Sequence, residues 1–249
     1  MEVGLLTTQD NDIALGLANL ASWYQKYSKY ATHISFSIVE VARVLNRPVD
    51  SPKLITKRLL SYDIVAVSTV TQDFNLVIEI CALLKALKPC IRIVLGGHHI
   101  SSIPESMPTT ADVLVLGKGE ETFQKLLDAF VENHDWEVES LSKIDGIAYY
   151  QRQKLVRTKK RFFIKDIDQI PLLAYQLFDK RHWYPVFAKG FKVFGSVSTS
   201  RAALTIVYSA ILQGFGETQS GFIAQHAWLT ISNCCTGSTV VSLLWSRMI

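Results

Sequence analysis

The chain has 249 residues, of which 49% are hydrophobic and 19% are charged, and its formal net charge is +4. This length suits one large domain or one domain with a smaller piece, and the composition favours a folded core over disorder. The weak positive charge gives no reason to expect nucleic acid or an anionic membrane surface as a partner.

Neither the amino terminus nor the cysteines carry a targeting or metal signal. The opening residues, MEVGLLTTQDND, lack the basic start and long apolar core of a signal peptide, and no uncharged apolar run reaches about 18 residues. The four cysteines are Cys81, Cys90, Cys234 and Cys235, and no Cys-x-x-Cys or Cys-x-x-x-Cys spacing links them. We therefore expect a cytoplasmic protein with no transmembrane span and no metal ligands.

Residues 1–135 alternate apolar runs with amphipathic segments. Five runs predict buried strands, at 3–8, 32–39, 63–70, 91–97 and 111–117. Four segments have helical spacing, at 14–28, 51–62, 75–88 and 120–133. This alternation indicates a doubly wound α/β domain with a parallel five-stranded sheet. Five strands favour a flavodoxin-like order, with ligands at the carboxyl edge of the sheet.

The pattern changes after this domain. Residues 144–165 predict a β-hairpin around QRQK, and residues 168–179 predict an extended connector that contains proline. We therefore divide the chain into a domain at 1–135, a hairpin and connector at 136–201, and an irregular tail at 202–249.

The ends of the predicted strands place hydroxyls, glycines and a histidine pair at the carboxyl edge. In strand order the candidates are Thr7, Thr8 and Gln9; Ser68, Thr69, Thr71 and Gln72; Gly96, Gly97, His98 and His99; and Gly117, Gly119 and Glu120. Glycine lets a ligand approach the backbone closely, and N–H groups and hydroxyls bind amides or phosphates.

Each of these features also has a purely structural interpretation. Gly96 and Gly97 also suit a simple turn, and Gly117 and Gly119 suit the entry to a helix whose dipole Glu120 or Glu121 complements. The histidines are expected in a loop, where solvation is the common outcome. A nucleotide-binding G-x-G-x-x-G, a P-loop and a G-x-S-x-G nucleophile turn are all absent from the sequence.

Taken together, four segments resemble the N-terminal half of cobalamin-dependent radical SAM enzymes, over about residues 1–201. The segments are IRIVLGGHHISSIPES, ADVLVLGKGEETFQKLLDAF, IDGIAYYQRQKLV and DQIPLLAYQLFD. The positions that match the family pattern are Leu95, Gly96, Gly97, His98, Pro104, Glu105, Gly117, Gly119, Glu120, Thr122 and Phe123.

The resemblance implies a domain that binds cobalamin (vitamin B12) over the carboxyl edge, with no catalytic residue and no protein metal ligand of its own. The implied contacts are Thr8, Gln9, Ser68, Thr69, Thr71, Gln72, Gly96, Gly97, His98, Gly117, Gly119 and Glu120. The Asp-x-His-x-x-Gly motif that supplies a cobalt ligand in other cobalamin proteins is absent, and QDFNLV stands in that region. A base-off cobalamin is therefore expected, with His98 beside the nucleotide tail. The family's usual Asn-Pro-Pro after the first strand is replaced by Thr7, Thr8 and Gln9.

The resemblance stops at Arg201. In the family, Ser-Arg is followed by Gly-Cys-Pro and a Cys-x-x-x-Cys-x-x-Cys motif that holds a [4Fe–4S] cluster, whose open iron site binds S-adenosylmethionine. Here Ala202, Ala203 and Leu204 follow, so we expect a cobalamin-binding chain that is inactive alone. A small-molecule or nucleotide-binding module without cobalamin is the alternative. A hydrolase or transferase ranks last, because no nucleophile–base set is visible.

Our hypothesis for the missing motif is a frame change after Arg201. Codons chosen for Ala202–Ala210, read with one extra G in front, give Gly-Cys-Pro-Tyr-Asp-Cys-Ile-Phe-Cys, a complete cluster motif. Residues 202–249 also contain only two charged side chains, Glu217 and Arg247, although a small apolar subdomain would share that composition. The parent's substrate and the oligomeric state leave no signal in the sequence.

We predict that sequencing the gene around codon 201 will show a cysteine-rich reading in the adjacent frame. An adjacent frame without those three cysteines would contradict the frame change and favour a genuine apolar subdomain.

Overall fold

The computed structural model describes residues 1–8, 15–41, 43–44, 47–48, 50–161, 164 and 169–177. They all belong to the first of two compact units, Met1–Gly195. Three expectations from the sequence lie outside the described residues: the contacts of Gln9, the end of the connector, and the tail at 202–249. No helix in the described part of the chain is long and apolar enough to cross a membrane.

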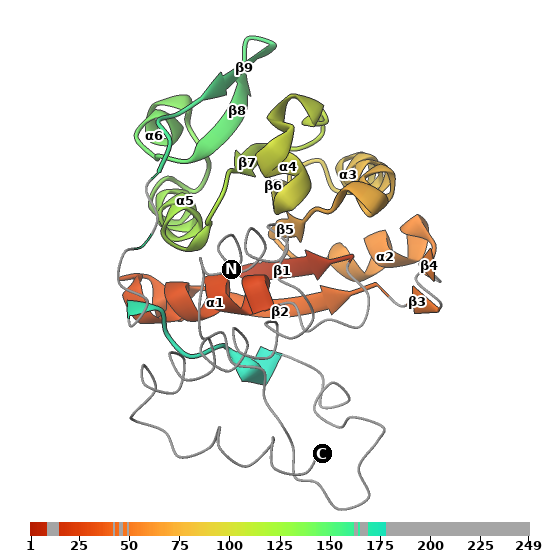
Figure 1. The fold of residues 1–249 in the computed structure, drawn as a ribbon, viewed down its shortest axis with the longest axis horizontal. Coiled ribbons are helices and arrows are strands. Elements are labelled where there is room, and N and C mark those ends of the chain that lie inside the picture. The colour runs from red at the N-terminus through yellow and green to blue at the C-terminus, as the bar shows by residue number, and fades with distance from the viewer. Residues whose placement is uncertain are drawn as a thin grey trace, which may run out of the picture. The chain divides into compact units, whose positions relative to one another are not determined.

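Five parallel strands form the centre of the fold. In the order in which they lie side by side, they are β2 (Ser35–Glu40), β1 (Glu2–Thr7), β5 (Ile64–Ser68), β6 (Arg92–Gly96) and β7 (Val113–Val115). This is the flavodoxin-like order, in which the second and third strands lie on opposite sides of the first. The predicted doubly wound α/β fold is therefore confirmed (Figure 1).

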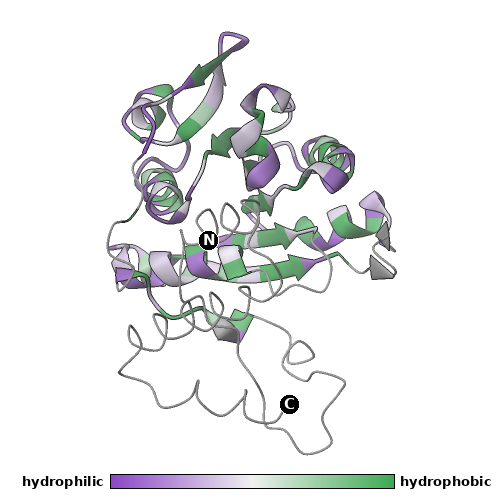
Figure 2. Cartoon of the chain, in the orientation of Figure 1, coloured by the Kyte–Doolittle hydropathy of each residue, from purple (hydrophilic) through white to green (hydrophobic). Residues whose placement is uncertain are grey.

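Helices cover both faces of this sheet (Figure 1). One face carries α1 (Leu15–Tyr27) and α5 (Glu120–Asn133), and the other carries α2 (Pro52–Leu59) and α3 (Phe74–Leu87). Neighbouring residues of β1 serve different faces, since Leu5 joins the core under α1 and Leu6 joins the core under α3. Both faces are buried, so the strands are apolar along their length, as the colouring of Figure 2 shows.

Local signals account for the ends of the helices. The Ser51 hydroxyl accepts a hydrogen bond from the Leu54 N–H at 3.3 Å, and Pro52 occupies the first helical position, so α2 begins where the Ser-Pro pair predicts. Helix α5 has the predicted bounds, and His134 in the left-handed conformation ends it.

Four short elements were not expected from the sequence. The segments β3 (Arg43–Val44) and β4 (Arg47–Pro48) pair with each other, and two five-residue helices are present, α4 (His98–Ser102) and α6 (Val138–Ser142). The expectation of a loop at His98 and His99 is wrong, because these residues form the start of α4. A five-residue helix is too short to show a hydrophobic period, which explains the error.

The predicted hairpin is confirmed as β8 (Ile147–Gln151) and β9 (Lys154–Arg157). Arg152 and Gln153 form its two-residue turn with φ values of 48° and 64°, as the right-handed twist of a tight hairpin requires. The hairpin continues the sheet, because β8 pairs antiparallel with β7. The sheet therefore has seven strands, and the hairpin shares the hydrophobic core of the parallel part.

The described part of the connector packs on the same domain. The Tyr27 hydroxyl donates to the Gln169 carbonyl oxygen at 2.5 Å, and Leu173 and Ala174 are buried in the core next to α1. A short turn, η5 (Tyr175–Leu177), follows and lies near β2. The chain beyond the hairpin thus returns to the opposite end of the sheet.

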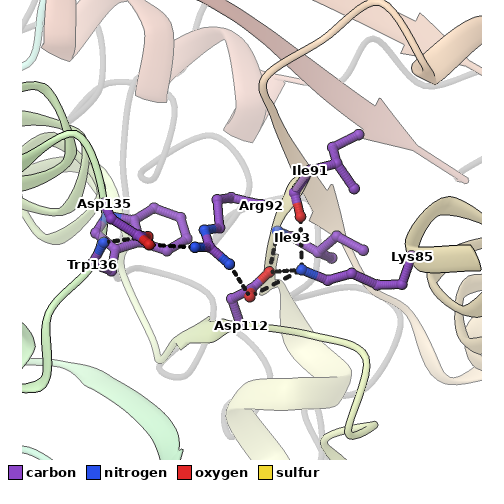
Figure 3. Close-up of polar contacts among 7 residues, drawn as sticks. All are labelled: Lys85, Ile91, Arg92, Ile93, Asp112, Asp135 and Trp136. Atoms are coloured by element: carbon purple, nitrogen blue, oxygen red, sulfur yellow. Dashed lines mark hydrogen bonds and ion pairs between the residues drawn. The ribbon is translucent and has the colours of Figure 1, made fainter. Parts of the chain in front are cut away.

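A group of charges fastens the amino ends of β6 and β7 (Figure 3). Asp112, just before β7, accepts hydrogen bonds from Lys85 of α3 at 2.8 and 3.0 Å and from Arg92 at 3.3 Å. It also accepts from the Ile93 N–H at 2.7 Å. Because Asp112 is only partly exposed and contacts two cations, its charge is neutralised within the fold.

Arg92 extends this group to the end of α5 (Figure 3). Its second guanidinium nitrogen donates to Asp135, which also accepts from the Trp136 N–H at 2.6 Å. Burial acts to raise the pKa of Asp135, but Trp136 and Arg92 outweigh it and hold that pKa below its usual value. These contacts thereby link the sheet to α3 on one face and to the loop after α5 on the opposite face.

The carboxyl ends of β5 and β6 meet in a close backbone contact. A Cβ on Gly97, which has a φ of +97°, would lie 2.6 Å from both the N and the O of Thr69. Thr69 donates to the Gly96 carbonyl oxygen from its N–H at 2.7 Å and from its hydroxyl at 2.6 Å. The His99 N–H donates to the Thr69 oxygen at 3.2 Å. Glycine at 97 therefore fixes the start of α4 against the loop after β5.

We predict that Asp112→Asn lowers the free energy of unfolding by about 2 kcal/mol, because Lys85 and Arg92 lose a charged acceptor. The matched control is Glu139→Gln, which removes an exposed pair with Lys143 and should leave the free energy of unfolding nearly unchanged. Urea unfolding of the full chain measures both. Equal losses would show that the Asp112 contacts do not stabilise the fold.

We also predict that Gly97→Ala lowers the free energy of unfolding by about 3 kcal/mol, from backbone strain and from overlap with Thr69. Gly117→Ala is the control, because Gly117 also has a positive φ but no atom lies within 4 Å of its Cβ position. Strain alone should cost this control about 1 kcal/mol. A Gly97→Ala loss no larger than that of the control contradicts the close contact.

Candidate functional site

The carboxyl ends of the parallel strands meet at one edge, and the chain departs in opposite directions from β1 and β5. β1 and β5 are neighbours, and α1 and α3, the helices that follow them in the chain, cover opposite faces; open α/β sheets bind ligands in a crevice at such a switch point. Thr8 follows β1, and Thr69 follows β5. The structure thus places Thr8 and Thr69 at the ends of neighbouring strands.

The two threonines at the switch point differ in their hydrogen bonds. Thr69 is fully buried, donates to Gly96 and accepts from the Ile100 N–H at 3.4 Å, so its hydroxyl serves the fold. Thr8 is also fully buried, but its Oγ1 has no hydrogen-bond partner among the described residues. A buried hydroxyl without a partner is costly, so Thr8 is the group at this edge that a ligand would satisfy.

The glycines of the edge fall into two kinds. Gly97 is required by packing, and Gly119 is closely packed, since a Cβ on it would lie 3.2 Å from Val115 and 3.3 Å from Leu20. Gly117 has a φ of +75° with open space around it, and its N–H donates to the Ser101 hydroxyl at 2.9 Å. Gly117 therefore leaves room at the surface, as a glycine beside a ligand does.

The remaining candidates also lie at this edge, with different exposure. Thr71, Gln72 and His98 are exposed, Ser68 and Gly96 are half-buried, and Glu120 is 4% exposed at the start of α5. The edge offers hydroxyls, a side-chain amide and backbone N–H groups, which bind the polar side groups of a ligand.

His99 is a candidate at this edge that the resemblance does not include among the implied cobalamin contacts. It is 8% exposed, whereas His98 points to solvent, and its ring stacks on Phe74 with centroids 3.9 Å apart. Its Nδ1 lies 3.1 Å from the Thr71 hydroxyl, and its Nε2 lies 3.1 Å from the Ser106 hydroxyl. A helix that begins at residue 98 turns the side chains of His98 and His99 in different directions. A loop interpretation of these residues could not predict that difference.

The described residues do not include a group of three or more His, Cys, Asp or Glu side chains that could hold a metal ion. Of the two cysteines in the described ranges, Cys90 is exposed and Cys81 is buried in the core next to α3. Burial raises the pKa of the Cys81 thiol to about 12, which keeps it protonated.

Residues 36–127 match the family model of the B12 binding domain. This range runs from β2 into α5 and includes the carboxyl ends of β5, β6 and β7. Thr8 and Gln9 precede it, so β1 and the whole segment that follows it up to β2 lie outside the match.

Two curated proteins are similar to the chain. An uncharacterized methyltransferase of Pyrococcus horikoshii is 28% identical over 176 residues, which cover 69% of this chain and 36% of the relative. The anaerobic magnesium-protoporphyrin IX monomethyl ester cyclase of Synechocystis sp. is 30% identical over 117 residues, which cover 45% of this chain and 22% of the relative. The chain thus spans well under half of each relative's length.

A search of solved structures finds the apo, selenomethionine-labelled form of OxsB, a cobalamin-dependent S-adenosylmethionine radical enzyme. It is 16% identical with a TM-score of 0.48, over 69% of this chain and 24% of that protein. The family match and the parallel sheet agree on the kind of domain that these residues form. Residues 36–127 therefore match the B12 binding domain family, within a parallel α/β sheet.

Proposed function

We propose that the chain binds cobalamin over the carboxyl edge of its sheet, with the nucleotide tail entering the crevice between β1 and β5. The observation that carries this proposal is the buried Thr8 hydroxyl at that crevice, which has no partner among the described residues. The open backbone at Gly117 supports it, because bulk can approach there without a clash. The residues present therefore fit a large ligand with polar side groups.

The proposed contacts are those that the edge displays. They are Thr8, Gln9, Ser68, Thr69, Thr71, Gln72, Gly96, Gly97, His98, Gly117, Gly119 and Glu120. Within this set, Thr8 binds a polar group of the tail, and Ser68 and Gly96 offer the small ends of β5 and β6 to the ligand. Gly97, Gly119 and the Thr69 hydroxyl act through packing and hydrogen bonds within the protein.

We further propose that cobalamin is base-off here, without a protein ligand on cobalt. The segment 72–77, which stands in the region of the usual cobalt-ligating motif, forms the turn η2 (Thr71–Asp73) and the first residues of α3. Its Phe74 faces the His99 ring. His99 already contacts two hydroxyls, so it is occupied within the loop cluster. When bound, cobalamin supplies a cobalt centre that can carry a methyl group.

The activity of a longer parent is a separate proposal. The relatives include a methyltransferase and a cyclase, and we propose a parent that uses a [4Fe–4S] cluster and S-adenosylmethionine with cobalamin in the cytoplasm. The 249 residues contain no Cys-x-x-x-Cys-x-x-Cys motif, so this chain would bind cobalamin without radical chemistry. The out-of-frame origin of residues 202–249 belongs to the same proposal.

We predict that the full chain retains hydroxocobalamin after desalting, with an altered ultraviolet–visible spectrum. Thr8→Val should stabilise the apoprotein by about 1 kcal/mol by removing a partnerless hydroxyl. The same change should weaken cobalamin binding about tenfold, because the ligand loses that hydrogen bond. Thr8→Ser, which keeps the hydroxyl, is the matched control and should retain the affinity.

The opposite signs make this test specific. A Thr8→Val variant that is stabilised but binds cobalamin as tightly as the parent chain would remove Thr8 from the site. If neither the unmutated chain nor a variant retains a corrin, the result favours a small-molecule or nucleotide module without cobalamin.

A further inference from the structure

The hydrogen bonds around His99 define which atom is the donor in each contact. The Ser106 hydroxyl lies 2.6 Å from the Ile103 carbonyl oxygen, which can only accept. Its single hydrogen is therefore used there. The 3.1 Å contact between Ser106 Oγ and His99 Nε2 then requires the ring nitrogen to donate. His99 carries its proton on Nε2.

The other ring nitrogen follows from the surroundings of the ring. His99 is 8% exposed, its face lies on Phe74, and both nitrogens contact neutral hydroxyls, of Thr71 and Ser106. None of these three groups carries a negative charge to balance an imidazolium, and an unbalanced buried charge is costly. The neutral ring with hydrogen on Nε2 has a bare Nδ1, which accepts. The Thr71 hydroxyl, 3.1 Å away, must donate to it.

We call the hydrogen bonds that join Ser106, His99 and Thr71 the relay. From this relay we infer that the Thr71 hydroxyl offers only acceptor lone pairs to a ligand, so it selects a ligand N–H donor at that point of the edge. Thr71 is exposed at the start of η2, three residues after β5 ends, so it lies at the carboxyl edge of the sheet. The inference rests on the proposed cobalamin site, where the matching groups are the primary amides on the rim of the corrin. A carboxylate or phosphate oxygen at the same place would meet lone pairs and be rejected.

The relay gives Thr71 a different role from Thr8. Thr8 is free to donate or accept among the described residues, whereas the hydrogen of Thr71 is held by His99. Loss of the His99 acceptor would release this hydrogen. The Thr71 hydroxyl could then rotate and donate to a ligand oxygen, so the polarity of the contact depends on a residue that does not touch the ligand.

The first experiment reads the relay without any ligand. Nitrogen-15 NMR of the histidine side chains in the full apoprotein, with His99 assigned by its absence in His99→Phe, should show a protonated Nε2 and a bare Nδ1 at neutral pH. A proton on Nδ1, in either the other tautomer or the imidazolium, overturns the inference.

The second experiment reads the selection. The probes are hydroxocobalamin and a set of its monocarboxylic acids, each with one corrin amide replaced by a carboxylate. The unmutated 249-residue chain should bind one of these acids about tenfold more weakly than it binds hydroxocobalamin. The Thr71→Val variant should bind that acid and hydroxocobalamin equally. Thr71→Ser, which keeps the hydroxyl, should retain the discrimination. His99→Phe should lose it, because the released hydrogen can meet the carboxylate.

The outcomes separate this inference from the proposed function. No binding of hydroxocobalamin by the parent chain would contradict the cobalamin site while the NMR result still tests the relay. If the unmutated chain and Thr71→Val both bind hydroxocobalamin and every acid equally tightly, the cobalamin site is retained. The role of Thr71 is then overturned. Should His99→Phe fail to fold, the comparison of Thr71→Val with Thr71→Ser decides the point.

Discussion

The contact between Gly97 and Thr69 is the constraint on which the binding edge depends. It places two backbones so close that a Cβ at residue 97 would lie 2.6 Å from the N and the O of Thr69. Because β6 turns there without a side chain, α4 begins directly beside the loop after β5. This brings His99 within hydrogen-bond distance of Thr71, and the edge becomes one connected surface instead of separate loops.

The two edges of the sheet use opposite chemistry. At the amino edge, Asp112 is closed between Lys85 and Arg92, so the charges neutralise each other and hold β6 and β7 together. At the carboxyl edge most of the candidate groups are uncharged, and Thr8 keeps a hydroxyl without a partner among the described residues. Charge-assisted hydrogen bonds hold two strands together strongly. Neutral hydrogen bonds within the protein can be replaced by hydrogen bonds to a ligand at little cost in free energy.

Much of the fold could be predicted from the sequence because its signals are local. Continuous apolar runs marked the five parallel strands, Ser51 and Pro52 marked the start of α2, and the turn at Arg152 marked the hairpin. The ligand contacts of the site stay predictions. Glycines 96, 97, 117 and 119 were all read as ligand contacts, yet the packing of two of them is explained by neighbours far away in the sequence. Such contacts leave no periodic trace in a single chain.

The sequence by itself determined the alternation of strands and helices, and the resemblance of its loop motifs pointed to the B12 binding domain that the family match then identified. The tertiary structure decided which of two adjacent histidines is buried and which way each hydroxyl donates. The physical reason is that the spacing of hydrophobic residues can be seen in the sequence, whereas the direction of a hydrogen bond depends on partners from separate segments of the chain. Ser106 fixes the proton of His99, and His99 in turn fixes that of Thr71.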